Sequence, residues 1–301
     1  MNIPFSQYDD LIIWGAGNMG RHIQHLLDDR PLCFWDTNAN ANKNVPKDIL
    51  GVNVLAPFSN IDHLSNPIII VAIGDKTIST RICNELQDRG IDHMAGTNAI
   101  NQIYKCKLSN FCSESFESGK KHVLLVGDSI IEQFAINKYR DSDSCIYHNR
   151  GIAGDTIIGL LGHLDCSFYG NKMDKIFLCI GTNDLNQDSL IEDMIVNTEN
   201  VLNFIRDKHT NTETHIISLL PVNETDNFSY NIVQNRRNSQ IIRFNVSLFE
   251  LCSKLNFSFL NIFSNFLDDK GQLSTAFTED GVHLNEKGYS LLNQILDTHL
   301  I

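Results

Sequence analysis

The sequence predicts an α/β protein of two domains, each with a parallel sheet that helices cover on both faces. The chain has 301 residues, which exceeds the usual size of one domain. Short apolar runs alternate with helical patterns in both halves, which is typical of buried parallel strands joined by helical crossovers. A polar stretch, rich in serine at its end, separates the halves. We therefore expect a small first domain at residues 1–100, a linker at residues 101–120 and a larger second domain at residues 121–301.

The first domain opens with an apolar strand that ends in glycines and leads into a helix. Two further strands and one more helix follow before the linker. Three strands make about half of a complete dinucleotide-binding sheet, so we expect a small, shortened version of that fold. The predicted strands are residues 11–17, 31–36 and 66–75, and the predicted helices are residues 18–29 and 77–90.

The second domain contains five predicted strands with helical stretches between them. The strands are residues 122–127, 144–149, 175–181, 214–220 and 257–263, and the two longest helical patterns are residues 190–209 and 238–256. This alternation predicts a doubly wound sheet between two layers of helices. Ligands of such sheets bind beyond the carboxyl ends of the strands, so functional residues are expected there.

The turn after the first strand of the chain, GAGNMG, has the glycine spacing of a dinucleotide-binding turn. Gly15, Gly17 and Gly20 allow a tight turn that brings a helix N-terminus to a phosphate, and Asp36 ends the next strand. The domain also resembles the N-terminal Rossmann-like domains of bacterial nucleotide-sugar acetyltransferases, in which this domain binds a UDP-sugar. Three alternatives stay open: a nucleotide-sugar or sugar-phosphate ligand, NAD, or a purely structural role without a ligand.

The first strand of the second domain ends in Gly127-Asp128-Ser129. Asp128 or Ser129 could serve only as the cap of the following helix, because both residue types cap helices well. Near the C-terminus, however, Asp280 and His283 lie three residues apart before the last predicted helix. A serine nucleophile needs an adjacent base, and a histidine base needs a carboxylate to fix its tautomer. These residue types favour Ser129 as a nucleophile that His283 and Asp280 activate.

Two further strand ends carry groups that can donate hydrogen bonds. Gly154 follows the second strand of this domain in NRGIAGDT, and Asn183 follows the third in GTND. An acyl-transfer intermediate carries an oxyanion, which backbone N–H groups and side-chain amides stabilise. We expect the N–H groups of Ser129 and Gly154 and the amide of Asn183 to form an oxyanion hole. We expect Asp155 and Asp184 to bind backbone N–H groups of neighbouring loops.

Together these motifs resemble the SGNH (GDSL) hydrolase family over residues 121–301. NRGIAGDT and IGTNDL are most similar to the branch that includes platelet-activating-factor acetylhydrolase and bacterial acyl esterases. The first block reads GDSI where the family often has GDSL or GDSN, and an apolar residue remains at that place. The resemblance implies a flavodoxin-like three-layer αβα fold, a Ser–His–Asp triad, no metal, and activity on O-acyl esters. Its four blocks are Gly127-Asp128-Ser129, Gly154, Asn183 and Asp280-x-x-His283.

Three functions are compatible with these motifs. The leading hypothesis is hydrolysis of an O-acyl ester, above all an O-acetyl ester, of a carbohydrate-type or small substrate through an acyl-enzyme and without a cofactor. The second is transfer of the acyl group to a sugar or a surface-polysaccharide precursor, which shares the first half-reaction. The third is a non-catalytic scaffold that binds nucleotide-sugars. The complete set of residues argues against this last function: Ser129, Gly154, Asn183, Asp280 and His283.

Composition narrows the partners and the compartment. The net charge of −12 argues against a nucleic-acid binder and against docking on anionic lipid. No apolar run reaches membrane-spanning length and the first residues lack a signal-peptide pattern, so we expect a cytoplasmic protein with reduced cysteines. None of the eight cysteines forms a CxxC pair, which gives a zinc site little support. The sequence assigns no oligomeric state.

A long polar segment, residues 221–238, lies between a predicted strand and a predicted helix. Loops on a rigid scaffold often carry specificity, so we expect this segment to face the substrate. Arg236 and Arg237 could contact an acidic or sugar substrate there, or they could simply belong to a solvated helix start.

Overall fold

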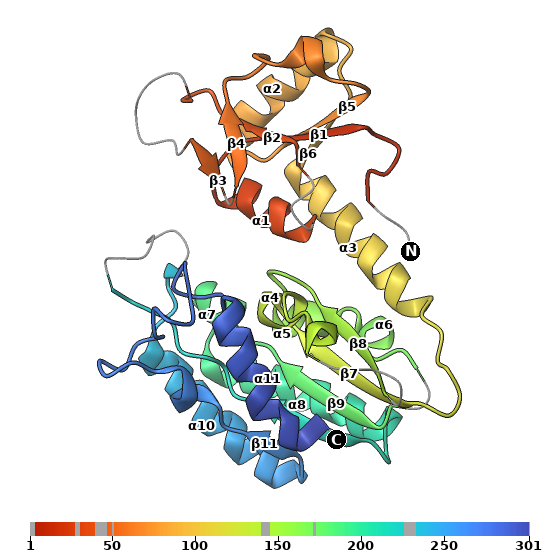
Figure 1. The fold of residues 1–301 in the computed structure, drawn as a ribbon, viewed down its shortest axis with the longest axis vertical. Helices are drawn as coiled ribbons and strands as arrows, with labels where there is room; N and C mark the ends of the chain where they lie inside the picture. Colours follow the sequence, from red (N-terminus) through yellow and green to blue (C-terminus); the bar gives the residue numbers. More distant parts are fainter. Residues whose placement is uncertain are drawn as a thin grey trace. The chain divides into compact units, whose positions relative to one another are not determined.

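The computed structural model divides the chain into two compact units, residues 1–110 and 111–301. It describes residues 4–27, 31–39, 47–49, 51–139, 145–170, 173–225 and 233–300. Each unit has its own sheet and its own helices (Figure 1). Both units are α/β with largely parallel sheets, as the sequence predicts.

The sheet of the first unit has six strands in the order β3-β4-β2-β1-β5-β6. All neighbours pair in parallel except β3 and β4. The five parallel strands therefore follow the order 3-2-1-4-5, as in doubly wound sheets. The strands are β1 (Asp10–Trp14), β2 (Cys33–Trp35), β3 (Asp48–Ile49), β4 (Val52–Leu55), β5 (Pro67–Val71) and β6 (His93–Ala95).

The expectation of only three strands in this unit was wrong. The three additional strands, β3, β4 and β6, are two to four residues long and mostly half-buried or exposed. Segments this short lack the continuous apolar run that marks a central strand, so the sequence pattern does not reveal them. Besides most of α3 (Gly96–Cys112), the helices of this unit are α1 (Asn18–Leu26) and α2 (Lys76–Asp88), with a 3-10 turn at Ile61–His63.

The predicted linker is largely helical. Helix α3 (Gly96–Cys112) covers most of it and begins directly after β6. Ala99 and Ile103 lie one helical turn apart and are fully buried, although most of the surrounding residues are polar. This narrow apolar stripe is a buried face of α3, most of which belongs to the first unit.

The sheet of the second unit has the order β11-β10-β9-β7-β8, with all neighbours parallel. When the sheet is followed from β8 to β11 and its strands are numbered by their place in the chain, the order is 2-1-3-4-5, which is the strand order of flavodoxin-like sheets. The order reverses between β7 and β9, so the expected binding crevice lies at the carboxyl ends of these two strands. All five predicted strands are present: β7 (Lys121–Gly127), β8 (Cys145–Gly151), β9 (Lys175–Cys179), β10 (Glu213–Ile217) and β11 (Ser258–Leu260).

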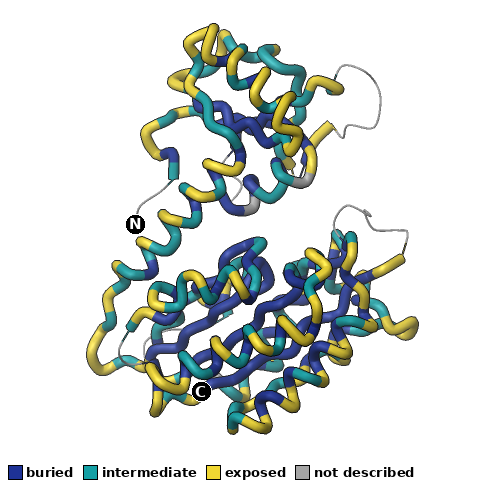
Figure 2. The backbone as a smooth tube through the Cα atoms, turned by 180° about the vertical axis from the view of Figure 1, so that it is seen from behind, coloured by how far each residue is buried: buried dark blue, intermediate teal, exposed yellow. Residues whose placement is uncertain are grey.

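Helices cover this sheet in two layers (Figure 1). Contacts join α5, α8 and α10 in one layer. In the other layer Tyr289 of α11 donates its hydroxyl to the Ile130 carbonyl oxygen of α4 and stacks on Phe134, which follows α4. The strands are buried and the helices turn exposed faces outward (Figure 2). No helix in the described part of the chain is long and apolar enough to cross a membrane. The helices are α4 (Ser129–Glu132), α5 (Ile157–Leu161), α6 (Leu164–Ser167), α7 (Thr182–Asn186), α8 (Ile191–Lys208), α10 (Asn238–Leu255) and α11 (Glu286–Leu300), with 3-10 turns at Ile136–Lys138 and Phe263–Phe266.

Candidate active site

The turn between β7 and α4 presents Ser129. Strand β7 ends at Gly127, where a Cβ atom would collide with the carbonyl oxygen of Cys179 at the end of β9. Asp128 is the N-cap of α4, and its Oδ1 accepts a hydrogen bond of 3.0 Å from the Ile130 N–H. Since Asp128 caps the helix, the hydroxyl of Ser129, the first helical residue, is free for another partner.

That partner is His283, near the C-terminal end of the chain. Ser129 Oγ lies 2.9 Å from His283 Nε2, and His283 Nδ1 lies 2.6 Å from Asp280 Oδ2. An ionised carboxylate can only accept hydrogen bonds, so His283 Nδ1 carries the proton that it donates to Asp280. In the neutral imidazole this leaves Nε2 as an acceptor for the proton of the Ser129 hydroxyl.

The surroundings of Asp280 keep its carboxylate ionised. Its Oδ1 accepts backbone N–H groups from Val282 at 2.9 Å and from His283 at 2.8 Å. Burial acts to raise the pKa of Asp280, but the hydrogen bond and charge of His283 and these two N–H groups together lower it to about 2. Asp280 is therefore a charged, fixed acceptor at neutral pH.

Two partners fix the orientation of the Asn183 amide. Asn183 Nδ2 donates to the carbonyl oxygen of Asp155 at 2.9 Å, and Asn183 Oδ1 accepts from Nη2 of Arg236 at 2.9 Å. A guanidinium only donates and a carbonyl only accepts, so the positions of the amide nitrogen and oxygen are unambiguous. Among the described residues, the second Nδ2 hydrogen has no acceptor.

Gly154 lies in the turn after β8, with a left-handed φ of 77°. Neither its N–H nor the N–H of Ser129 donates to another residue in the described part of the chain. The turn is tied to α4, because the Ala153 N–H donates to the Glu132 carboxylate at 2.6 Å and Asn149 Nδ2 donates to carbonyl groups of α4. Glu132 and Asn149 thus hold the Gly154 turn against the helix that carries Ser129.

The two aspartates next to the donor residues have the structural contacts that we expected. Both carboxylate oxygens of Asp184 lie 3.1 Å from the Ile157 N–H, and Asp155 Oδ1 accepts from the Thr156 N–H at 3.0 Å. These bonds secure the start of α5. Burial is the largest influence on the pKa of Asp184 and raises it to about 6.

The long polar segment at 221–238 is only partly described, because residues 226–232 lie outside the described residues. Arg237 is half-exposed and lies 3.9 Å from Glu224. Arg236 is only 7% exposed, and its Nε donates to the carbonyl oxygen of Thr182 at 3.2 Å. A solvated helix start does not agree with this buried guanidinium, whereas contact of Arg236 with a substrate stays a prediction. In the sequence, Arg236 is one of two neighbouring arginines before a predicted helix, and nothing there indicates that its side chain is buried.

The glycine-rich turn of the first unit combines packing and hydrogen bonding. A Cβ atom at Gly15, which has a φ of 121°, would lie 2.6 Å from the Ala72 carbonyl oxygen, whereas Gly17 has open space around it. Asp36 Oδ2 accepts the Ala16 N–H at 3.2 Å. The structure thus brings the turn and Asp36 together, and Asp36 serves to hold the turn.

The third glycine of the motif fits the start of α1 tightly, because a Cβ atom at Gly20 would collide with the Gly15 carbonyl oxygen. Close helix–strand packing therefore accounts for Gly20 without a ligand. Within the described residues, no group of three His, Cys, Asp or Glu side chains is arranged to hold a metal ion.

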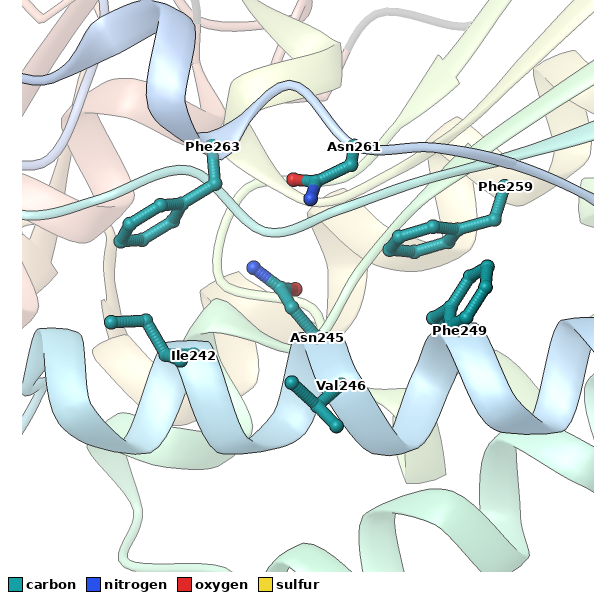
Figure 3. A pocket seen from close by; sticks show the side chains of 7 residues that line it. All are labelled: Ile242, Asn245, Val246, Phe249, Phe259, Asn261 and Phe263. Atoms are coloured by element: carbon teal, nitrogen blue, oxygen red, sulfur yellow. The ribbon is translucent and has the colours of Figure 1, made fainter.

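An apolar hollow of about 360 Å³ lies between α10 and the segment around β11 (Figure 3). Apolar side chains line both walls, and the amides of Asn245 and Asn261 point toward each other across it. None of the residues that surround Ser129 belongs to its lining, so the hollow is separate from the candidate active site. It is lined by Ile242, Asn245, Val246, Phe249, Phe259, Asn261 and Phe263.

A three-layer α/β domain with a linked serine, histidine and aspartate at the carboxyl edge of its sheet has the architecture of an acylhydrolase. Residues 125–291 match the GDSL-like Lipase/Acylhydrolase family over more than half of the chain, and the chain belongs to that family. Membership makes it an ester hydrolase, of a kind that generally needs no cofactor. No curated protein matches the sequence.

Solved structures support the fold. A Streptococcus pneumonia protein, provisionally described as a platelet activating factor, is 29% identical, with a TM-score of 0.63, and the match covers 76% of this chain and 100% of that one. A provisionally described acylhydrolase from Bacteroides fragilis is 18% identical, with a TM-score of 0.56 and coverage of 65% and 94%. The acetyl xylan esterase AlAXEase is 16% identical, with a TM-score of 0.51 and coverage of 60% and 100%. The last two likenesses concern the fold alone.

Proposed function

We propose that the chain is a serine-dependent esterase in which Ser129 is the nucleophile, His283 the general base and Asp280 the residue that orients it. The observation that carries this proposal is the continuous hydrogen-bond relay from Ser129 Oγ through both ring nitrogens of His283 to Asp280 Oδ2. A serine that merely capped a helix would not need this relay, and Asp128 already provides the cap.

The reaction follows from the direction of the hydrogen bonds. Ser129 Oγ attacks the ester carbonyl carbon while its proton passes to His283 Nε2. The tetrahedral oxyanion receives hydrogen bonds from the N–H groups of Ser129 and Gly154 and from the free Nδ2 hydrogen of Asn183. The protonated His283 then gives its proton to the leaving alcohol. Water repeats the sequence on the acyl-enzyme and releases the acid.

We propose an O-acetyl or other short O-acyl ester of a carbohydrate-type or small alcohol as the substrate. The acetyl xylan esterase among the solved structures illustrates this chemistry on a similar fold, and the first unit adds a glycine-rich turn of the type that accepts phosphates. A nucleotide-sugar or NAD at Gly15, Gly17, Gly20 and Asp36 stays a prediction. The open space at Gly17 is compatible with a close ligand, whereas packing alone explains Gly15 and Gly20.

The first experiment measures acetate release from p-nitrophenyl acetate, with and without a pool of sugars and nucleotide-sugars, and identifies the products by mass spectrometry. Ser129→Ala should abolish turnover. Ser253→Ala, which changes an exposed serine of α10, should leave turnover unchanged. Free acetate as the only serine-dependent product supports the esterase. An acetylated sugar would instead show acyl transfer.

Labelling with a fluorophosphonate tests the nucleophile separately. Wild-type protein should be labelled at Ser129 and the Ser129→Ala variant should not. Absence of labelling in folded wild-type protein would overturn the catalytic proposal and favour the scaffold function.

A further inference from the structure

We propose that Arg236 is a positioning residue for the oxyanion hole. It holds the Asn183 amide with its nitrogen toward the oxyanion. This inference rests on the proposed function of Asn183. Arg236 does not touch the reacting atoms; it acts through the amide oxygen, which accepts from its Nη2 at 2.9 Å.

The guanidinium binds two successive residues at the start of α7. Its Nε donates to the Thr182 carbonyl oxygen at 3.2 Å while its Nη2 binds Asn183 Oδ1. One rigid plane therefore fixes both the backbone and the side chain at this position, which an ammonium on a flexible stem cannot do in the same way. Because Arg236 is only 7% exposed, water does not readily replace these bonds.

The orientation of the Asn183 amide matters because its two ends have opposite polarity. With Oδ1 held by Arg236 and one hydrogen of Nδ2 held by the Asp155 carbonyl oxygen, the other hydrogen can meet the oxyanion. Without the arginine, only the Asp155 carbonyl oxygen holds the amide, so the amide can turn more easily and bring its oxygen toward the oxyanion, which it would repel. A cation at the amide oxygen also polarises the amide and strengthens Nδ2 as a donor.

The charges around Arg236 keep it cationic. Burial lowers its pKa, but the nearby carboxylates of Asp128 and Asp280 oppose this effect. The arginine in turn lowers the pKa of Asp128, in which burial is the largest influence. The guanidinium therefore offsets part of the negative charge beside the nucleophile, where a further negative charge must develop during the reaction.

A double-mutant cycle tests the inference on the full-length protein with p-nitrophenyl acetate. Losing an oxyanion donor lowers kcat by roughly 100- to 1,000-fold, which is the expectation for Asn183→Ala. Arg236→Met should lower kcat by at least tenfold but no more than Asn183→Ala, with KM nearly unchanged. In the Asn183→Ala background, Arg236→Met should cost less than about twofold, because the group through which it acts is gone.

Arg236→Lys keeps the charge but cannot bind the Thr182 carbonyl oxygen and Asn183 Oδ1 with one rigid plane. Its kcat should therefore lie between that of Arg236→Met and that of the wild type. Arg243→Met is the matched control, because Arg243 is an exposed arginine of α10 whose side chain lies 4.0 Å from Glu192, and it should leave kcat unchanged. Thermal unfolding followed by circular dichroism checks that each variant folds. If Arg236→Met does not fold, the cycle is run with Arg236→Lys.

The outcomes separate this inference from the proposed function. Equal losses from Arg236→Met in both backgrounds, or an unchanged kcat in a folded variant, would overturn the positioning role. If Ser129→Ala retained full activity, the proposed function itself would fail, whatever the arginine variants did. If Asn183→Ala alone retained full activity, Asn183 would not belong to the oxyanion hole, and the positioning role of Arg236 would fail while the serine esterase would stand.

Discussion

Replacing Asp280 with asparagine tests the direction of the proton in the relay. Asp280→Asn keeps the size of the side chain, and its Oδ1 can still accept the backbone N–H groups of Val282 and His283. Its amide nitrogen would take the place of Oδ2, 2.6 Å from His283 Nδ1. A donor at that place forces Nδ1 to become an acceptor, so Nε2 carries the proton and cannot accept one from Ser129.

Both an activity loss and a stability loss follow. A histidine held in the wrong tautomer should lower kcat by roughly 10,000-fold. The pKa of Asp280 falls from the ordinary 3.8 to about 2, which corresponds to about 2 kcal/mol of stability. Because the folded pKa is lowered, this contribution is complete above about pH 4 and is lost as the pH falls toward 2. The free energy of unfolding of the variant should therefore be lower than that of the wild type at neutral pH, and it should change less with pH between about 2 and 4.

Hydrolysis of p-nitrophenyl acetate gives kcat, and urea unfolding at several pH values gives the free energy of unfolding. Asp207→Asn, which removes an exposed charge near the end of α8, is the matched control for both assays. A kcat of Asp280→Asn within tenfold of the wild-type value, in folded protein, would refute the assignment of Asp280 as the residue that orients the base.

Three other predictions concern the turn, the cap and the first unit. Gly127→Ala should lower the free energy of unfolding in urea by roughly 2–4 kcal/mol, because its Cβ would meet the Cys179 carbonyl oxygen; wild-type stability would contradict the packing argument. Burial raises the pKa of Asp128 to about 6, so its contribution to stability is greatest below about pH 4 and falls as the pH rises through 6. Asp128→Asn should remove up to about 3 kcal/mol of this pH dependence, and identical urea profiles for both proteins between about pH 4 and 8 would rule it out. Removing residues 1–110 should leave kcat on p-nitrophenyl acetate within about threefold, because every residue of the relay lies in the second unit; a folded but inactive product would show that the first unit contributes to the site.

Sequence patterns predicted the fold where strands are long and fully buried. The apolar runs at β7 and β9 are continuous, and glycine and polar residues mark their ends. The sequence therefore predicted these strands and the edge of the sheet at which they end. The short strands β4 and β6 were missed because they are only half-buried and lack such runs. Helix α3 was read as a linker because its buried stripe is narrow.

The sequence by itself determined the residue types of an acylhydrolase site and their order along the chain, because that chemistry permits few residue types. Only the tertiary structure showed that Ser129 and His283, 154 residues apart, meet at 2.9 Å. It also showed that Arg236 turns inward to the Asn183 amide rather than outward to solvent. The physical reason is that the direction of a long side chain depends on the acceptors and charges that folding brings near it. Local sequence does not record these partners.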